Sequence, residues 1–173
     1  MKRQPISAHI RTRAGQPASP EARLQEAARD AFACWASGVT VIAVRDGPHV
    51  LAITATAFMP LSLEPPLILA CIGLNATVLP FLGIGRRFTV NLLAEEQRRL
   101  ASLFADPAPL ERSAFPAEGD PVLADALASL GCVVRRTHRE GDHDLVVGSI
   151  EQVELHDERE PLLYFARQYR GLR

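Results

Sequence analysis

The stretch Ile53–Phe58 combines small side chains with hydroxyl groups at the end of a predicted strand. Thr54 and Thr56 alternate there with Ala55 and Ala57. Small side chains let a ligand approach the backbone amides, and threonine hydroxyls can donate to ring nitrogens and carbonyls. The residues are compatible with two interpretations, which are a ligand-binding strand end and an ordinary corner of a sheet.

Two further segments carry groups that could bind a ligand. Asn75–Thr77 precedes a predicted short helix over residues 77–82, and the free amides at a helix start favour a phosphate. A plain N-cap by Asn75 explains the same residues. The turn Gly141–Asp144 places His143 between two predicted strands, where its imidazole can hydrogen-bond a ligand in either protonation state or lie in solvent.

Other chemistry is not supported by the sequence. It contains no glycine-rich dinucleotide or phosphate-loop motif, no G-x-S-x-G elbow and no H-E-x-x-H pair. The three cysteines lie far apart, without a C-x-x-C pair: Cys34, Cys71 and Cys132. We therefore predict no metal site and no disulfide framework, and free thiols are typical of a reducing cytoplasm.

Length and charge limit the remaining possibilities. A chain of 173 residues favours one domain. Its 19 basic and 20 acidic residues give a net charge of −1, whereas duplex nucleic-acid binders carry a basic excess. The N-terminus lacks the apolar region of a secretory signal, and the apolar stretch Leu67–Gly73 is too short to span a bilayer. We expect a cytoplasmic protein that binds neither nucleic acid nor a membrane.

The N-terminal part divides into an arm and a helix. Residues 1–19 have little apolar content, and we predict a flexible arm. Ser19 and Pro20 are a capping residue and a first-turn proline, and apolar side chains recur at helical spacing as far as Trp35. Gly38 is the predicted stop of this helix. We expect residues 20–173 to form a single domain.

The rest of the chain is a series of short strands with turn signals. Predicted strands cover 39–44, 50–58, 67–72, 87–93, 132–137 and 145–155, with a last apolar element over 161–165. The predicted helix over 95–106 is followed by a proline-rich loop over 107–121. The strands do not alternate regularly with long helices, so the prediction is a mainly β fold with some α, a β-barrel with a few flanking helices.

Several segments, taken in order, resemble one known family. They are Gly38–Val41, Thr54–Phe58, Ser62–Leu67, Phe88–Leu93, Phe104-Ala105, Gly141–His143, Val147-Gly148 and Pro161–Tyr164. Their order and spacing resemble the flavin reductase-like family, which comprises the short-chain NAD(P)H:flavin reductases of two-component monooxygenases. One departure is Ala52, where most relatives have glycine.

The resemblance implies an FMN-binding split β-barrel, usually a homodimer with flavin sites near the subunit interface. It implies FMN or FAD as flavin and NADH or NADPH as hydride donor, with His143 holding the nicotinamide against the flavin. The flavin-binding residues carried over by resemblance are Thr54, Ala55, Thr56, Ala57, Ser62, Cys71, Ile72, Gly73, Asn75, Thr77, Phe104, Ala105 and, from the tail, Tyr169.

The expected function is hydride transfer from nicotinamide to flavin, which supplies reduced flavin to a partner monooxygenase. The cofactors carry the electronic chemistry in such a reaction, and the protein supplies position. Two alternatives remain open at this point. One is another FMN-dependent oxidoreductase or oxidase on the same barrel, and the other is a non-catalytic flavin- or haem-binding module.

Overall fold

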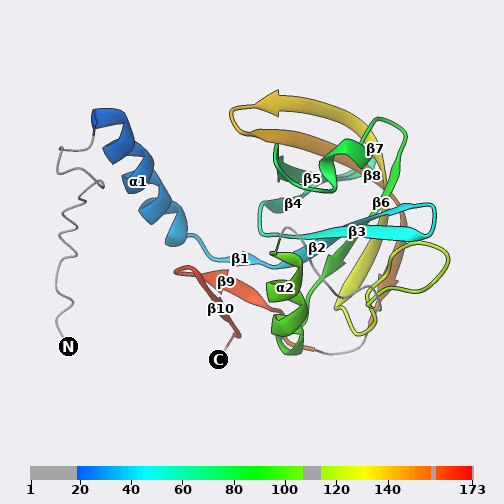
Figure 1. Ribbon diagram of the computed structural model, residues 1–173. Coiled ribbons are helices and arrows are strands. Elements are labelled where there is room, and N and C mark those ends of the chain that lie inside the picture. The colour runs from blue at the N-terminus through cyan, green and yellow to red at the C-terminus, as the bar shows by residue number, and fades with distance from the viewer. Residues whose placement is uncertain (1–18, 107–113, 157–158, 173) are drawn as a thin grey trace. The chain divides into compact units, whose positions relative to one another are not determined.

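The computed structural model describes residues 19–106, 114–156 and 159–172, and it consists of two compact units, residues 1–35 and 36–173 (Figure 1). The predicted arm over 1–19 lies outside the described residues except for Ser19. The single domain over residues 20–173 stays a prediction.

The first unit contains the helix α1 (Pro20–Ala33). The Ser19 side chain accepts a hydrogen bond from the Ala22 amide at 3.1 Å, which confirms the predicted cap. The helix ends before Gly38, the predicted stop, because Gly38 pairs with Leu163 in a strand of the second unit. None of the residues of α1 is buried.

The second unit is built mainly of strands. Its elements are β1 (Ser37–Gly38), β2 (Thr40–Asp46), β3 (His49–Ala55), β4 (Phe58–Leu63), β5 (Pro66–Gly73), the 3₁₀ turn η1 (Leu79–Phe81), β6 (Arg87–Leu92), the 3₁₀ turn η2 (Glu95–Gln97), α2 (Arg98–Phe104), β7 (Ala128–Glu140), β8 (His143–Leu155), β9 (Leu163–Phe165) and β10 (Gln168–Arg170). This confirms the predicted mainly β class.

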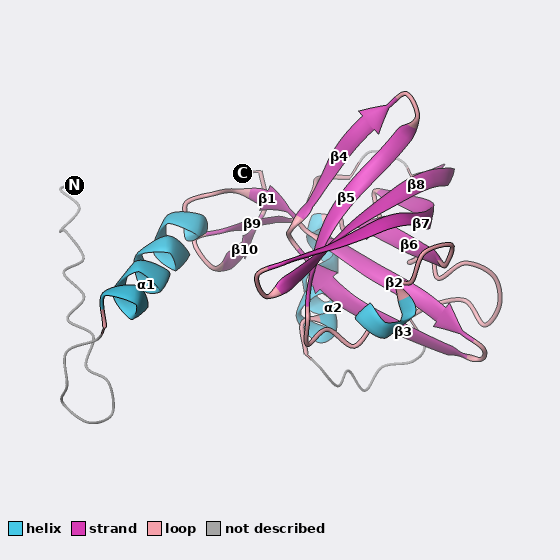
Figure 2. Ribbon diagram, turned by 90° about the horizontal axis from the view of Figure 1, so that it is seen from above, coloured by secondary structure: helices cyan, strands magenta, loops and turns pink. Residues whose placement is uncertain are grey.

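One antiparallel sheet forms the barrel. Its seven strands follow the order β3-β2-β6-β7-β8-β5-β4, and β7 and β8 form a long hairpin (Figure 1). The two edge strands, β3 and β4, are consecutive in the chain and are joined by just Thr56 and Ala57. The sheet must therefore curve until its edges meet at this link, and Figure 2 shows the strands wound round in this way. We call this meeting point the seam.

Hydrophobic side chains pack on both faces of the curved sheet. In β2, Ile42 and Val44 face the interior of the barrel, where they pack with Ile68, Phe88 and other side chains. Val41 and Ala43 belong to a second core, on the outside, which includes residues of α2 and Leu162. This alternation follows from the two-residue period of a strand. The second core also borders the small sheet β1-β9-β10 through Tyr164 and Tyr169.

Several predicted elements differ in extent from those in the structure, and three of the differences lie beside the seam or the β7–β8 turn. The strand predicted over 50–58 breaks at the seam, because Ala57 accepts a hydrogen bond from Cys71 and the chain there changes its partner from β2 to β5. The helix predicted over 77–82 is reduced to the short turn η1. The turn predicted over 139–144 is limited to residues 141 and 142, since β7 and β8 pair up to Glu140 and His143.

Candidate functional site

A cavity of about 330 Å³ opens at the seam of the barrel. The end of β3 and the link to β4 form one side, the end of β5 and the following turn form another, and the C-terminal end of α2 and the first residue of β8 complete it. Its lining residues are Ile53, Thr54, Ala55, Thr56, Ala57, Cys71, Gly73, Asn75, Ala76, Thr77, Phe104, Ala105, Asp106 and His143. A volume of this size is within the range of small-molecule sites.

The threonine at the end of β3 fixes one wall of the cavity. Thr54 donates its hydroxyl hydrogen bond to the carbonyl of Ala101 at 2.7 Å, and this bond ties β3 to α2. Because of this bond, the end of the same helix is held against β3, where Phe104 and Ala105 form a wall of the cavity. In this structure the Thr54 hydroxyl thus donates within the protein, and donation from Thr54 to a ligand stays a prediction.

Small side chains leave the cavity open. Gly73 is the clearest example, because a Cβ atom added there would have His143 Nε2 as its nearest neighbour, at 3.9 Å. Ala55, Ala57 and Ala76 contribute only methyl groups. The open space between β3 and β5 therefore suits a flat ring, with Thr56, Asn75 and Thr77 as polar groups around it.

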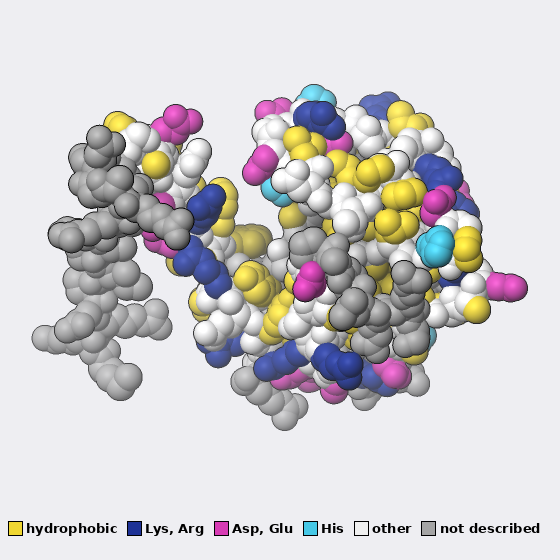
Figure 3. Space-filling view, in the orientation of Figure 1, with side chains coloured by type: hydrophobic (Ala, Val, Ile, Leu, Met, Phe, Trp, Pro, Cys, Tyr) yellow, Lys and Arg dark blue, Asp and Glu magenta, His cyan; other side chains and the backbone are white. Residues whose placement is uncertain are grey.

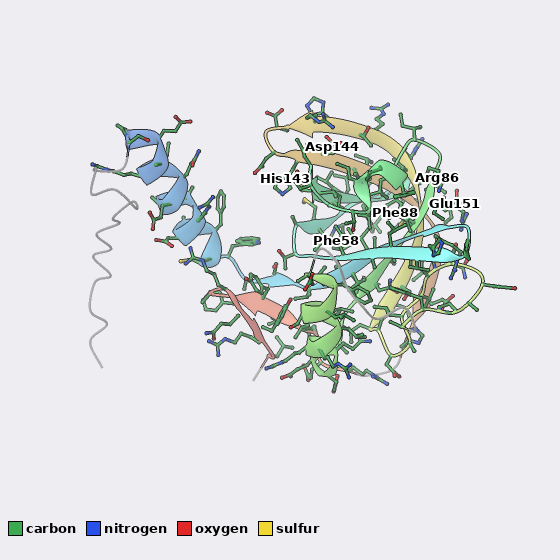
Figure 4. The ribbon with its side chains drawn as sticks, viewed as in Figure 1. Phe58, Arg86, Phe88, His143, Asp144 and Glu151 are labelled. Atoms are coloured by element: carbon green, nitrogen blue, oxygen red, sulfur yellow. The ribbon has the colours of Figure 1, made fainter. Side chains whose placement is uncertain are left out.

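His143 begins β8 beside the cavity (Figure 4). Its Nδ1 lies 2.7 Å from Oδ1 of Asp142, the preceding residue. The Asp142 carbonyl accepts the amide of Leu74 at 3.0 Å, which joins the β7–β8 turn to the end of β5. Gly141 has a φ of +59°, a conformation that glycine adopts without strain, so the two-residue turn is compatible with its sequence.

An ion pair supports the same end of the hairpin. Arg139 donates from Nε and Nη2 to the two carboxylate oxygens of Asp144, at 2.9 and 3.2 Å. The hydrogen bond and the positive charge of Arg139 lower the pKa of Asp144 below its ordinary value. The pair therefore crosses from β7 to β8 next to His143.

Most of the predicted flavin-binding residues lie together in this cavity. They are Thr54, Ala55, Thr56, Ala57, Cys71, Gly73, Asn75, Thr77, Phe104, Ala105 and His143. Ile53, Ala76 and Asp106 also line the cavity and were not predicted as flavin-binding, although Ile53 and Ala76 lie within candidate ligand-binding segments. Sequence adjacency to Thr54, Asn75 and Ala105 was the available signal for them.

Three predicted residues lie outside the cavity. Ile72 points into the barrel interior and is 1% exposed, because it alternates with Cys71 and Gly73 along β5. The Ser62 hydroxyl, on β4, accepts the amide of Glu64. Tyr169, on β10, packs edge-on against Tyr164, with ring centroids 5.6 Å apart, and burial raises its pKa.

The three cysteines have different surroundings. Cys71 lines the cavity and is half-buried. Cys132 is fully buried in the barrel interior, and this burial raises its pKa to about 12. Cys34 is exposed. Within the described ranges, no group of three or more His, Cys, Asp or Glu side chains is arranged to hold a metal ion.

The surface and helices add two observations. On the face of the second unit that Figure 3 shows, basic and acidic side chains are interspersed, in keeping with the net charge of −1. Neither α1 nor α2, the α-helices among the described residues, is long and apolar enough to cross a membrane.

A curled antiparallel sheet with a small-residue cavity where its edges meet defines a split-barrel protein with a ligand site at the seam. The flavin reductase-like domain model matches residues 32–173. The chain belongs to this family, which confirms the predicted family, fold and enzyme class, an oxidoreductase that reduces flavin.

Relatives of known function and structure agree with this assignment. The chain is 46% identical to the reductase component of 4-hydroxyphenylacetate 3-monooxygenase of Thermus thermophilus, over 86% of this chain and 97% of that protein. It is 33% identical to the FMN reductase (NADH) RutF of Stutzerimonas stutzeri, over 86% of this chain and 89% of the relative.

Solved structures with the same fold include flavin reductase PheA2 in its native state. That structure has a TM-score of 0.78 and 34% identity, and the match covers 86% of this chain and 97% of PheA2. Another is the Streptomyces globisporus NADH:FAD oxidoreductase SgcE6 in complex with NAD and FAD fragments, with a TM-score of 0.76, 28% identity and coverage of 90% and 95%.

Proposed function

We propose that the seam cavity binds the flavin ring and that the chain reduces this flavin with NADH or NADPH for a partner monooxygenase. The family assignment establishes flavin reduction, and relatives named as monooxygenase reductase components support the partner. The observation that carries the proposal is that residues predicted as flavin-binding from separate parts of the chain line one cavity.

The residues present fit a flavin. Gly73 and the alanines of the cavity leave room for a flat tricyclic ring, and Thr56 and Asn75 can hydrogen-bond to the polar edge of such a ring. When bound, flavin supplies the hydride acceptor of the reaction. The protein binds and orients: Phe104 closes one side, and His143 lies where it can contact a nicotinamide placed over the flavin.

The test is the oxidation of NADH and of NADPH by the purified chain, followed by absorbance, with and without FMN or FAD. We expect oxidation that depends on added or bound flavin, and the four combinations identify the preferred pair. A chain that binds flavin but oxidises neither nucleotide contradicts the proposal. Oxygen consumption with a small amine or alcohol and no nicotinamide would instead favour the oxidase alternative.

We also propose that the chain works as a homodimer in the cytoplasm, where nicotinamide nucleotides and reduced thiols occur together. The support for the dimer is an apolar face on the outside of β4, β5 and β8. Strand pairing places Met59, Leu69 and Val147 in one row, with Cys71 and Leu145 in the next row on that face. These residues stay partly exposed and belong to neither core.

This outer face is continuous with the cavity through Cys71, so a second copy seated on it would border the flavin site. Sedimentation velocity checks the dimer. We expect two-chain particles for the natural protein and single chains for Leu69→Asp. Ile84→Asp is the control, because Ile84 is 73% exposed and lies off this face. A natural protein that sediments as single chains contradicts the dimer.

A further inference from the structure

The exposed carboxylate beside the cavity has a defined effect on the imidazole next to it. Oδ1 of Asp142 lies 2.7 Å from Nδ1 of His143. A carboxylate accepts hydrogen bonds and cannot donate them, so Nδ1 must carry the proton of this bond. In a neutral imidazole the second nitrogen, Nε2, is then an acceptor.

We propose that Asp142 is a positioning residue, which holds His143 in the Nδ1–H tautomer so that Nε2 presents a hydrogen-bond acceptor to the cavity. Asp142 does not line the cavity, whereas His143 does. Gly73 on β5 pairs with His143 on β8. Nε2 of His143 is the nearest atom to the position that a Cβ on Gly73 would take, so Nε2 points toward Gly73.

The backbone and a neighbouring ion pair keep this arrangement in place. The Asp142 carbonyl is fixed by the Leu74 amide, although the Asp142 side chain is 95% exposed. The Arg139–Asp144 pair joins β7 to β8 on the other side of His143. The imidazole thus sits between two anchored residues, and the carboxylate of Asp142 selects which of its nitrogens donates.

An acceptor at this position selects the ligand by chemistry. It favours a ligand group with N–H donors, such as the carboxamide of a nicotinamide, over a carboxylate at the same ring position. This step rests on the proposed function, in which His143 contacts the nicotinamide. The proposal therefore predicts that NADH is preferred to its reduced nicotinic acid analogue, in which a carboxylate replaces the carboxamide.

The tautomer can be measured directly, without any turnover. In the ¹⁵N-labelled protein, long-range ¹H–¹⁵N correlations of the His143 ring distinguish Nδ1–H from Nε2–H. We expect Nδ1–H in the natural protein and in Asp142→Asn, whose amide oxygen can still accept, and a shift toward Nε2–H in Asp142→Ala. Glu140→Ala, on the same hairpin, is the control and should leave the tautomer unchanged. An Nε2–H ring in the natural protein, or no response to Asp142→Ala, overturns the proposal.

Steady-state kinetics test the consequence for the nicotinamide. For Asp142→Ala we expect a KM for NADH raised about tenfold with kcat within about twofold, and for Asp142→Asn values close to the natural ones. The natural protein should also discriminate against the nicotinic acid analogue, and Asp142→Ala should discriminate less. An unchanged KM in Asp142→Ala contradicts the positioning role. A natural protein with the Nδ1–H tautomer but no NADH turnover would contradict the proposed function alone.

Discussion

Two glycines of the barrel, Gly148 on β8 and Gly73 on β5, serve opposite purposes. A Cβ on Gly148 would lie 2.6 Å from Cζ of Phe88, so the protein's own ring fills the space beside this glycine. A Cβ on Gly73 would meet nothing closer than His143 Nε2, at 3.9 Å. The barrel interior is thus closed by its own side chains, and the seam is left open for a ligand.

The comparison shows that a small residue in this fold can make room for a core side chain or for a ligand. Gly148 makes room for a core side chain, and Gly73 makes room for a flavin in the function we propose. The difference lies in how close the neighbouring side chains come, since the Phe88 ring of β6 occupies the space beside Gly148, whereas the nearest atom to a Cβ on Gly73 is His143 Nε2, at 3.9 Å. The predictions below separate the two roles.

The largest effect is expected from filling the seam. Ala57 is exposed and lines the cavity, so Ala57→Trp should occupy the ligand space without disturbing either core. We expect flavin affinity to fall by about 100-fold or more, with an unchanged melting temperature. Fluorescence titration with FMN measures the affinity. Natural affinity in a folded Ala57→Trp protein would place the flavin elsewhere.

Substitution of Gly148 in the closed interior should lower the stability of the protein. Gly148→Ala forces the Phe88 ring to move inside a packed core, which should lower the free energy of unfolding by about 1–3 kcal/mol. Urea denaturation measures this change. Adding Phe88→Leu removes the clash, so the double variant should be more stable than the sum of the single effects predicts. Strict additivity would show that the ring is not the cause.

A glycine-to-alanine substitution at the seam should instead weaken ligand binding and leave stability nearly unchanged. Gly73→Ala adds one methyl group to open space, so the free energy of unfolding should change by less than about 0.5 kcal/mol. Flavin affinity should fall, or the KM for NADH should rise, several-fold, since the methyl group enters the ligand space. A large loss of stability with natural binding would reverse the roles assigned to the two glycines.

The smallest effect concerns the hairpin end beside His143. Arg139 lowers the pKa of Asp144, so the stability that this pair contributes is present above the unfolded carboxyl value of about 4 and is lost as pH falls through the lowered folded value. The difference in melting temperature between the natural protein and Arg139→Gln should therefore shrink between about pH 6 and about pH 3. A difference that grows on acidification contradicts this sign.

Local patterns predicted much of the fold and the site. The Ser19 cap, the hairpin of β2 and β3 and the apolar strand β5 depend on neighbouring residues, and all are present. The cavity residues at the end of β3 are consecutive in the chain. At a strand end, side chains from both faces of the strand can lie beside the ligand space, so a local segment was enough to predict them. Their grouping with Phe104 and His143 followed from the family resemblance and not from spacing.

The predicted and observed placements differ at Ile72 because the strand period was not applied there, and elsewhere because long-range contacts decide. Ile72 cannot share a face with Cys71 and Gly73, and the two-residue period of a strand was enough to exclude it. The Thr54 hydroxyl bonds to a carbonyl 47 positions along the chain, a contact that no local pattern contains. Tyr169 belongs to a small sheet formed by segments from the two ends of the second unit, so its packing was equally beyond local patterns.

The most direct test of the central claim, a flavin bound at the seam, is alkylation of the cysteines in the dark with and without FMN, followed by mass spectrometry. Cys71 lines the cavity, Cys34 is exposed, and Cys132 is buried with a pKa raised to about 12. The account predicts that FMN slows the labelling of Cys71 about tenfold or more while Cys34 reacts as before and Cys132 stays unreactive. Labelling of Cys71 at the same rate under saturating FMN would contradict it.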